Sequence, residues 1–155
     1  MKRIIELKVN GEVHEALVEN HRTLLEVLRE NIGLVGTKEA CDTGECGACA
    51  VLLDGIPVNS CLVLALDGRG KEITTIEGLA VNGKLHPLQK AFMEHGATQC
   101  GFCTPGMIIT AKALLDENQK PTEQEVRQAI SGNMCRCTGY AKIVEAVMAA
   151  SAGGK

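Results

Sequence analysis

Apolar and polar residues alternate at the start of the chain with the period of two that is typical of β-strands. Residues 3–9 read RIIELKV, and residues 12–18 read EVHEALV. Between them, Asn10 and Gly11 form a dipeptide that strongly favours a two-residue hairpin turn. The pattern therefore predicts an antiparallel hairpin at the N-terminus.

The rest of the first half adds one helix and further strands. Residues 23–31, TLLEVLREN, have helical spacing, and Thr23 with Glu26 three positions later forms a capping box. Residues 49–63, CAVLLDGIPVNSCLV, contain an Asp-Gly turn between two apolar runs, which predicts a second hairpin. Residues 72–78, EITTIEG, supply a last β-branched run. A small α+β sheet around one helix is expected.

The pattern changes to helical periodicity in the second half of the chain. Thr104 followed by Pro105 is typical of a helix start, with the threonine as the cap and the proline in the first turn. Thr122 and Glu125 form a second capping box. Four helices joined by short loops predict a compact four-helix bundle. They are expected at residues 86–96, 104–118, 121–132 and 138–150.

Strand patterning stops within residues 77–85, which divides the chain into two expected domains. Residues 1–78 form the sheet domain in this scheme, and residues 79–155 form the helical domain. The last five residues, SAGGK, are small or polar and are expected to fray. Two domains of this size bury little surface each, so that metal or cross-link reinforcement is favoured.

Composition narrows the class of protein. The 155 residues carry a net charge of −3, and aromatic residues make up 2% of them, so a nucleic-acid partner is not expected. No apolar run approaches the roughly 20 residues of a membrane span. The N-terminus reads as a strand rather than a signal peptide, which predicts a cytoplasmic protein. In a reducing compartment, the eight cysteines are better explained as metal ligands than as disulfides.

Four of the cysteines lie in the first half, three of them within the stretch CDTGECGAC. The spacing C-x4-C-x2-C, with a fourth cysteine on the next segment, is the plant-type [2Fe–2S] spacing. Gly44 and Gly47 lack a Cβ, so the N–H groups of the loop can turn towards the sulfur atoms. A zinc site or a set of core cysteines is the alternative, but zinc loops usually pair their ligands in C-x2–4-C knuckles. The predicted ligands are Cys41, Cys46, Cys49 and Cys61.

The other four cysteines form two pairs, CGFC and CRC, each placed directly before a predicted helix. Helix N-termini favour thiolates and anionic clusters, and two helix starts that meet in a bundle provide four thiolates for one site. Spacing alone leaves a four-cysteine zinc site open, whereas a disulfide is disfavoured because nothing indicates secretion. The cluster site in the first half favours a second [2Fe–2S] cluster here. The predicted ligands are Cys100, Cys103, Cys135 and Cys137.

The combination of CDTGECGAC…C, QCGFCTPGM and GNMCRCTGY resembles the small iron–sulfur subunit of the molybdenum hydroxylases, the xanthine oxidase family. The resemblance covers nearly the whole chain, and all eight cysteine positions are filled. It implies a plant-ferredoxin-like β-grasp domain followed by an all-α four-helix bundle, with one [2Fe–2S] cluster in each. The likeness is strongest to bacterial small subunits, such as those of 4-hydroxybenzoyl-CoA reductase, nicotinate dehydrogenase and the aldehyde and carbon monoxide dehydrogenases.

The same resemblance implies partners and site residues. A large subunit would carry molybdopterin, in its cytosine dinucleotide form, and a medium subunit would carry FAD, within a heterotrimer or its dimer. Separate subunits are expected because the chain stops after its second domain. This chain would relay electrons between these cofactors and perform no substrate chemistry of its own.

Two residues are implied to contact the pterin. Gln99 resembles the family glutamine that hydrogen-bonds it, and Cys137 is expected close to it. A free two-cluster ferredoxin-type carrier is the alternative function, and a zinc-stabilised adaptor is a more distant one. No residue of this chain selects the substrate of the complex.

Overall fold

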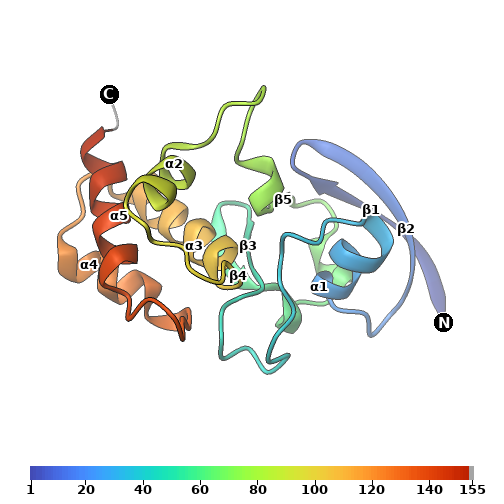
Figure 1. The fold of residues 1–155 in the computed structure, drawn as a ribbon. Coiled ribbons are helices and arrows are strands. Elements are labelled where there is room, and N and C mark those ends of the chain that lie inside the picture. Colours follow the sequence, from blue (N-terminus) through green and yellow to red (C-terminus); the bar gives the residue numbers. More distant parts are fainter. Residues whose placement is uncertain (154–155) are drawn as a thin grey trace.

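The structure, a computed structural model, describes residues 1–153 (Figure 1). The helices of the second half gather at one end of the molecule, and the first hairpin lies at the other end, close to the N-terminus. One mixed sheet followed by a helical domain confirms the predicted α+β class.

The sheet has five strands in the order β2-β1-β5-β3-β4. Strands β1 and β5 are parallel, and every other neighbouring pair is antiparallel. A parallel pair needs a long crossover connection, and here the chain between the two strands includes the helix, the first cysteine loop and the second hairpin. The bounds are β1 (Lys2–Val9), β2 (Glu12–Glu19), β3 (Ala50–Leu53), β4 (Ile56–Asn59) and β5 (Glu72–Thr74).

Both predicted hairpins are present, with the expected residues in their turns. Asn10 and Gly11 have φ values of 53° and 84°, and Asp54 and Gly55 have φ values of 52° and 82°. Two consecutive residues with positive φ are what a type I′ turn requires, and this turn matches the twist of the strands that it joins.

The predicted helix at residues 23–31 begins as expected but is mostly not α-helical. The capping box of Thr23 and Glu26 is complete. Only α1 (Leu24–Glu26) is α-helical, and a π-helix, Val27–Ile32, continues it to Gly33, whose φ is 84°. The apolar pattern identifies the residues that face the core but does not distinguish these two windings, because the pattern is compatible with both.

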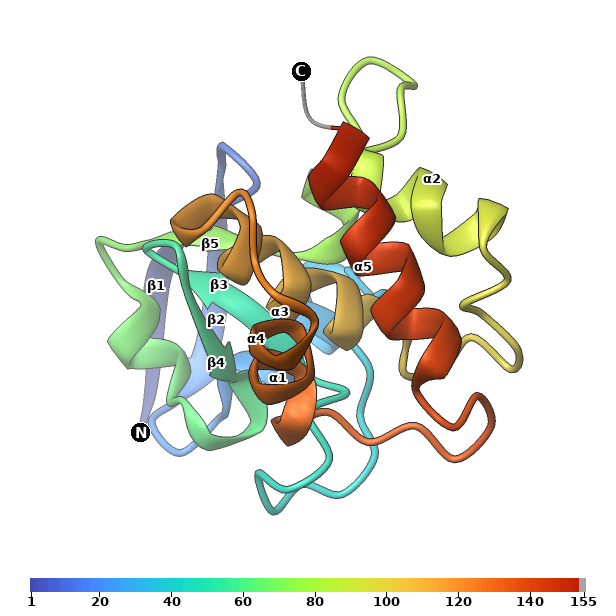
Figure 2. The same cartoon turned by 90° about the vertical axis from the view of Figure 1, so that its left-hand side faces the viewer.

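The four predicted helices of the second half are all present. They are α2 (Pro87–Glu94), α3 (Thr104–Glu117), α4 (Glu123–Ala129) and α5 (Ala141–Gly153). Short 3-10 turns stand at Ser60–Leu62, Ala65–Gly68, Ile76–Gly78 and Ile130–Gly132. Helix α3 packs against β3 and β4, while α2 and α4 pack against α5 (Figure 2).

Two helix starts differ from the prediction. Cys103, rather than Thr104, is the N-cap of α3, and the hydroxyl of Thr104 lies 3.3 Å from that of Thr98. Helix α5 begins at Ala141 and not near Thr138, since Gly139 and Tyr140 have φ values of 66° and 70°, which a right-handed helix excludes.

The expected fraying of the last five residues is wrong for residues 151–153, which belong to α5. Residues 154–155 lie outside the described part of the chain. Within residues 1–153, no helix has both the length and the apolar character needed to span a membrane.

The two halves of the chain share buried surface. Leu7, Leu28 and Ile73 are fully buried in the core under the sheet. By contrast, Ala50 and Leu52 of β3 pack into the core of the helical bundle. Strand β3 therefore belongs to the sheet by its hydrogen bonds and contributes to the bundle by its side chains.

Helix α3 approaches the first cysteine loop so closely that its contact residue has to be glycine. A Cβ on Gly106 would overlap the carbonyl oxygen of Gly47 and crowd Ala48. Both obstacles are backbone atoms, which do not rotate away as the end of a flexible side chain would. This contact fixes the distance between α3 and the loop.

We therefore expect Gly106→Ala to destabilise the fold. Overpacking of this kind is unfavourable by about 1–3 kcal/mol, and the better helix propensity of alanine recovers at most about 1 kcal/mol of it. Thermal and urea unfolding of the purified protein measure the difference.

Gly132→Ala is the matched control, because a Cβ at Gly132 meets no atom within 4 Å and its φ is not positive. Its stability should stay within about 0.5 kcal/mol of the parent protein. Equal stabilities of the Gly106 and Gly132 variants would contradict the close approach.

Candidate metal centres

The first four cysteines converge from two segments of the sheet domain. Cys41, Cys46 and Cys49 lie in the loop that leads into β3, and Cys61 lies in the 3-10 turn that directly follows β4. The turn is tied to the loop at Ser60, whose hydroxyl donates to the carbonyl oxygen of Cys49 at 2.7 Å and whose amide donates to it at 3.3 Å. The β3–β4 hairpin thereby brings the fourth cysteine to the other three.

Backbone N–H groups of the loop point at a sulfur atom, as the glycine positions predict. The amides of Thr43 and Cys46 donate to Sγ of Cys41 at 3.5 and 3.4 Å. Gly44 and Gly47 have φ values of 79° and 69°, a conformation that favours glycine. Hydrogen bonds from Thr43 and Cys46 lower the pKa of Cys41 to about 6. This thiol is therefore poised to bind as a thiolate.

Cys49 and Cys61 form a buried pair within this set. Both are almost fully buried, and they cluster with Leu25. Burial raises the pKa of Cys61 to about 12, and the adjacent Cys49 thiol adds to the increase. Because a buried charge needs a compensating charge nearby, this pair requires a cation before both thiols ionise.

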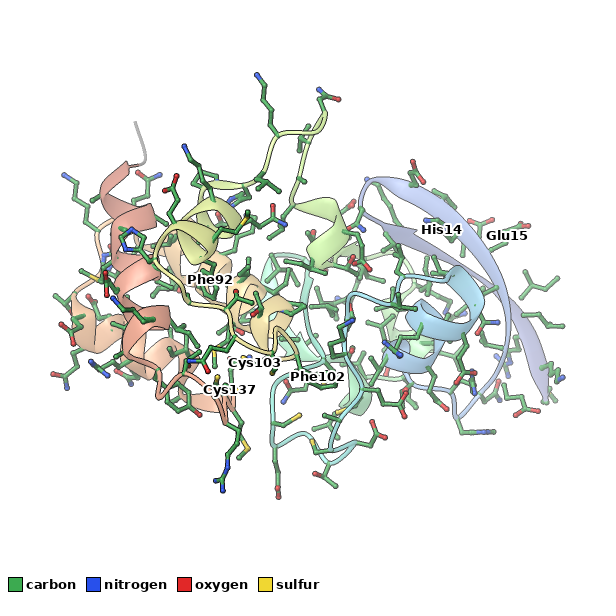
Figure 3. The ribbon with its side chains drawn as sticks, viewed as in Figure 1. His14, Glu15, Phe92, Phe102, Cys103 and Cys137 are labelled. Carbon is green, nitrogen blue, oxygen red and sulfur yellow. The ribbon has the colours of Figure 1, made fainter. Side chains whose placement is uncertain are left out.

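The second set of cysteines lies where the helical domain faces the first cysteine loop. Cys100 and Cys103 precede α3, and Cys135 and Cys137 stand in the loop between α4 and α5. Figure 3 places Cys103 and Cys137 in this part of the molecule, far from the β1–β2 hairpin. The structure thus brings together the two pairs that are separated by some thirty residues of sequence.

The thiols of the second set pair across these two segments. Burial raises the pKa of Cys103 to about 12, and the adjacent Cys135 thiol adds to the effect. The pKa of Cys137 is raised by the adjacent Cys100 thiol. Burial acts to raise the pKa of Cys135. Hydrogen bonds from Thr138 act in the opposite direction and outweigh burial, so the pKa of Cys135 is lowered.

The prediction that both pairs stand at helix N-termini is correct for only one of them. Cys103 is the N-cap of α3. Cys135 and Cys137 lie in a loop that ends before α5 begins at Ala141. The sulfur of Cys135 meets an N–H group of the loop instead, because the amide of Thr138 donates to it at 3.4 Å.

The donor sets fit a two-iron cluster. The thiols stand in pairs, such as Cys49 with Cys61 and Cys103 with Cys135, and a [2Fe–2S] cluster requires two thiolates on each of its two irons. Soft thiolate ligands with N–H groups aimed at the sulfurs are the surroundings of such clusters. Fold and donor sets are those of a two-cluster iron–sulfur protein.

Two hydrogen bonds, neither of which the sequence predicts, join the two sets. The amide of Met134, next to Cys135, donates to the carbonyl oxygen of Cys46 at 2.8 Å. The side-chain amide of the buried Asn133 donates to the carbonyl oxygen of Gly47 at 2.9 Å. Cysteine spacing carries no information about such backbone contacts between distant loops.

Gln99, the predicted pterin contact, lies at the surface beside the second set. Cys100 and Cys137 are exposed as well, whereas Cys103 and Cys135 are half-buried. The second set therefore has one side in the protein and one side facing outwards. Phe102, within the CGFC segment, is 46% exposed, and Met134 is 63% exposed.

Comparison with known proteins identifies the family. Residues 7–77 match the 2Fe-2S iron-sulfur cluster binding domain family, and residues 75–148 match the [2Fe-2S] binding domain family. The chain is 53% identical over 146 residues to the nicotinate dehydrogenase small FeS subunit of Eubacterium barkeri, covering 94% of this chain and 93% of that protein. It is 50% identical over 144 residues to the nicotine 6-hydroxylase small subunit of Paenarthrobacter nicotinovorans, covering 93% and 87%.

A solved structure supports the same family. A chain of quinoline 2-oxidoreductase from Pseudomonas putida 86 has a TM-score of 0.94 and 46% identity, with 97% of this chain and 94% of that chain covered. The chain belongs to the family of small [2Fe–2S] subunits of the molybdenum hydroxylases. It is an electron-transfer subunit of a molybdenum-dependent oxidoreductase, and its partner is a large subunit that carries molybdopterin.

The separation of the donor sets is tested by Cys137→Ser in the purified complex. A serine oxygen is a poor substitute for a thiolate on these irons, so we expect the loss of about two of about four irons per chain. The EPR spectrum of the first cluster should remain unchanged, because Cys41, Cys46, Cys49 and Cys61 are untouched.

Cys46→Ser is the reciprocal control and should remove the first cluster. Metal analysis and EPR of the reduced complex measure both variants. If Cys137→Ser diminished both clusters to the same extent, the division into two sets of four would be wrong.

Proposed function

We propose that this chain relays electrons between molybdopterin in the large subunit and FAD in a medium subunit. In this proposal Cys41, Cys46, Cys49 and Cys61 hold one [2Fe–2S] cluster, and Cys100, Cys103, Cys135 and Cys137 hold the other, nearer to molybdenum. The observation that carries the proposal is the hydrogen bond between the amide of Met134 and the carbonyl oxygen of Cys46.

That hydrogen bond makes a short connection between the two ligand sets. Cys46 belongs to the first set, and Met134 is bonded covalently to Cys135 of the second. Each cluster, when bound, accepts and releases one electron. The residues of the chain hold the two ligand sets at a fixed separation, because Met134 and Asn133 anchor one loop on the other. A relay needs this fixed geometry, whereas a zinc-stabilised adaptor does not.

The exposed side of the second set supports a contact with the large subunit. Gln99 and Cys137 lie at the surface there, available to the pterin. Phe102 and Met134 expose apolar surface next to the same cysteines, and apolar and aromatic residues of this kind are enriched in interfaces. This face suits a permanent partner better than it suits a freely diffusing carrier.

The first cysteine loop supports a second contact. Its residues Asp42 and Glu45 are exposed carboxylates, and Leu62, beside the loop, is 64% exposed. Complementary charges steer and orient protein partners. An FAD subunit that presents basic groups would therefore dock here, at the opposite end of the relay from the large subunit.

The remaining features of the assembly follow from the family. The proposal includes a heterotrimer or its dimer, molybdopterin in its cytosine dinucleotide form, and a cytoplasmic location, where eight ligand cysteines stay reduced. It divides the chain into domains at residues 1–78 and 79–155, a boundary just after the 3-10 turn Ile76–Gly78.

Purification of the complex through a tag on this chain, from a host that makes all subunits, tests the proposal. The preparation should contain molybdenum, FAD and two further subunits. The variant Gln99→Ala should retain both clusters and all subunits but turn over about tenfold more slowly, because about one hydrogen bond to the pterin is lost.

Gln119→Ala, which removes another exposed glutamine from a loop, is the control and should have the parental turnover. Normal turnover of Gln99→Ala would remove Gln99 from the pterin contact. A chain that emerges alone, with both clusters but with no molybdenum or flavin subunit, would instead support the free carrier.

A further inference from the structure

The loop that carries Cys135 and Cys137 is closed by the chain's one tyrosine, Tyr140. Its phenol oxygen accepts a hydrogen bond from the amide of Cys135 at 2.9 Å. Tyr140 has a φ of 70°, a conformation that is uncommon for a residue with a side chain. Such a conformation persists only where the surrounding contacts determine it. The contacts within this loop, among them the hydrogen bond from the Cys135 amide, therefore hold Tyr140 in place.

Thr138 lies in the same loop, between Cys135 and Tyr140. Its hydroxyl oxygen is 3.1 Å from Sγ of Cys135, and its amide donates to the same sulfur at 3.4 Å. The amide of Tyr140 donates to the Thr138 hydroxyl oxygen at 3.1 Å. Two consecutive hydrogen bonds therefore run from the amide of Tyr140 through the Thr138 hydroxyl to the sulfur of Cys135.

The direction of the Thr138–Cys135 bond follows from the chemistry of the two atoms. A cysteine that binds iron is a thiolate, which has no proton to donate. The Thr138 hydroxyl already accepts from Tyr140 and has one proton of its own. The hydroxyl is therefore the donor, and the sulfur is the acceptor. The bond from Tyr140 polarises the hydroxyl and strengthens its donation.

From this geometry we infer that Thr138 is a positioning residue for the second cluster. Its hydroxyl holds the Cys135 sulfur and raises the reduction potential of that cluster, while Tyr140 holds the hydroxyl in place. Hydrogen bonds to the ligand sulfurs are among the factors that set cluster potentials. The hydrogen bond shifts the reduction potential upwards, because reduction adds negative charge to the cluster and a hydrogen-bond donor stabilises that charge. The inference rests on the proposed role of Cys135 as a cluster ligand.

Thr104 provides an internal comparison. It directly follows the ligand Cys103, as Thr138 directly follows the ligand Cys137. Its hydroxyl, however, pairs with the hydroxyl of Thr98 at 3.3 Å. The two threonines thus have the same place in sequence relative to a ligand but different hydrogen-bond partners, and only Thr138 is expected to affect the potential.

The test is an EPR-monitored redox titration of the complete complex with Thr138→Val. Valine has nearly the same shape but no hydroxyl. The equilibrium constant for reduction of the second cluster, relative to the first, should fall about tenfold, which corresponds to about 59 mV for a one-electron couple. The midpoint of the first cluster should not move.

Three further variants make the result specific. Thr138→Ser keeps the hydroxyl and should restore the parental potential, and Thr104→Val should leave both potentials unchanged. Tyr140→Phe keeps the ring but removes the acceptor of the Cys135 amide, so it should release the iron of the second cluster to a chelator several-fold faster. An unchanged release rate would show that the Tyr140 phenol does not support the Cys135 loop; the amide of Tyr140, which donates to Thr138, is unaltered in this variant.

The outcomes separate this inference from the function on which it rests. An unchanged second potential in Thr138→Val, with four irons bound, overturns the role of Thr138 and leaves the relay intact. If Thr138→Val loses the second cluster while Thr138→Ser retains it, the hydroxyl holds the ligand, as inferred. If Thr138→Ser loses it as well, the hydroxyl is not the cause and the inference fails. If the unsubstituted complex bound no iron at the second site, the proposed function itself would be contradicted.

Discussion

The contact at Gly47 is the constraint on which the arrangement of both cysteine loops depends. Its carbonyl oxygen accepts the buried side-chain amide of Asn133, and Gly106 of α3 packs against the same carbonyl. Next to it, Cys46 accepts the amide of Met134. Apart from the Asn133 amide, these contacts join backbone atoms, and there is no space for a Cβ on either glycine. Functional groups are held precisely only when rigid elements support them, and here one loop supports the other.

Two of the ligand thiols, Cys61 and Cys103, resist ionisation until metal is present. Cys49 with Cys61, and Cys103 with Cys135, are neighbours whose burial and proximity disfavour the thiolate at one member of each pair. Iron supplies the positive charge that compensates them, so cluster binding contributes directly to the stability of the fold. A chain with small cores gains most from such reinforcement. The same clusters that carry electrons therefore also hold the two loops together.

Much of this architecture follows from local pattern. Capping boxes, Asn-Gly and Asp-Gly turns and apolar periodicity are local signals, and they predict the hairpins and the positions of the helices. Details that depend on tertiary contacts do not follow in this way. The π-winding after Glu26 and the late start of α5 at Ala141 are decided by how the segments pack and by the positive φ of Tyr140. Cysteine spacing predicts the two donor sets, but Asn133 and Met134, which join them, have no signature in sequence.

Two clusters at a short, fixed separation in one chain are what this arrangement of ligands predicts, and EPR of the fully reduced complex at low temperature tests it most directly. Two signals of equal intensity are predicted, and each should be broadened or split by the magnetic moment of the other. Removing one cluster by substitution of a ligand should abolish the broadening of the remaining signal. Two signals that show no mutual interaction, or one signal alone, would contradict the account.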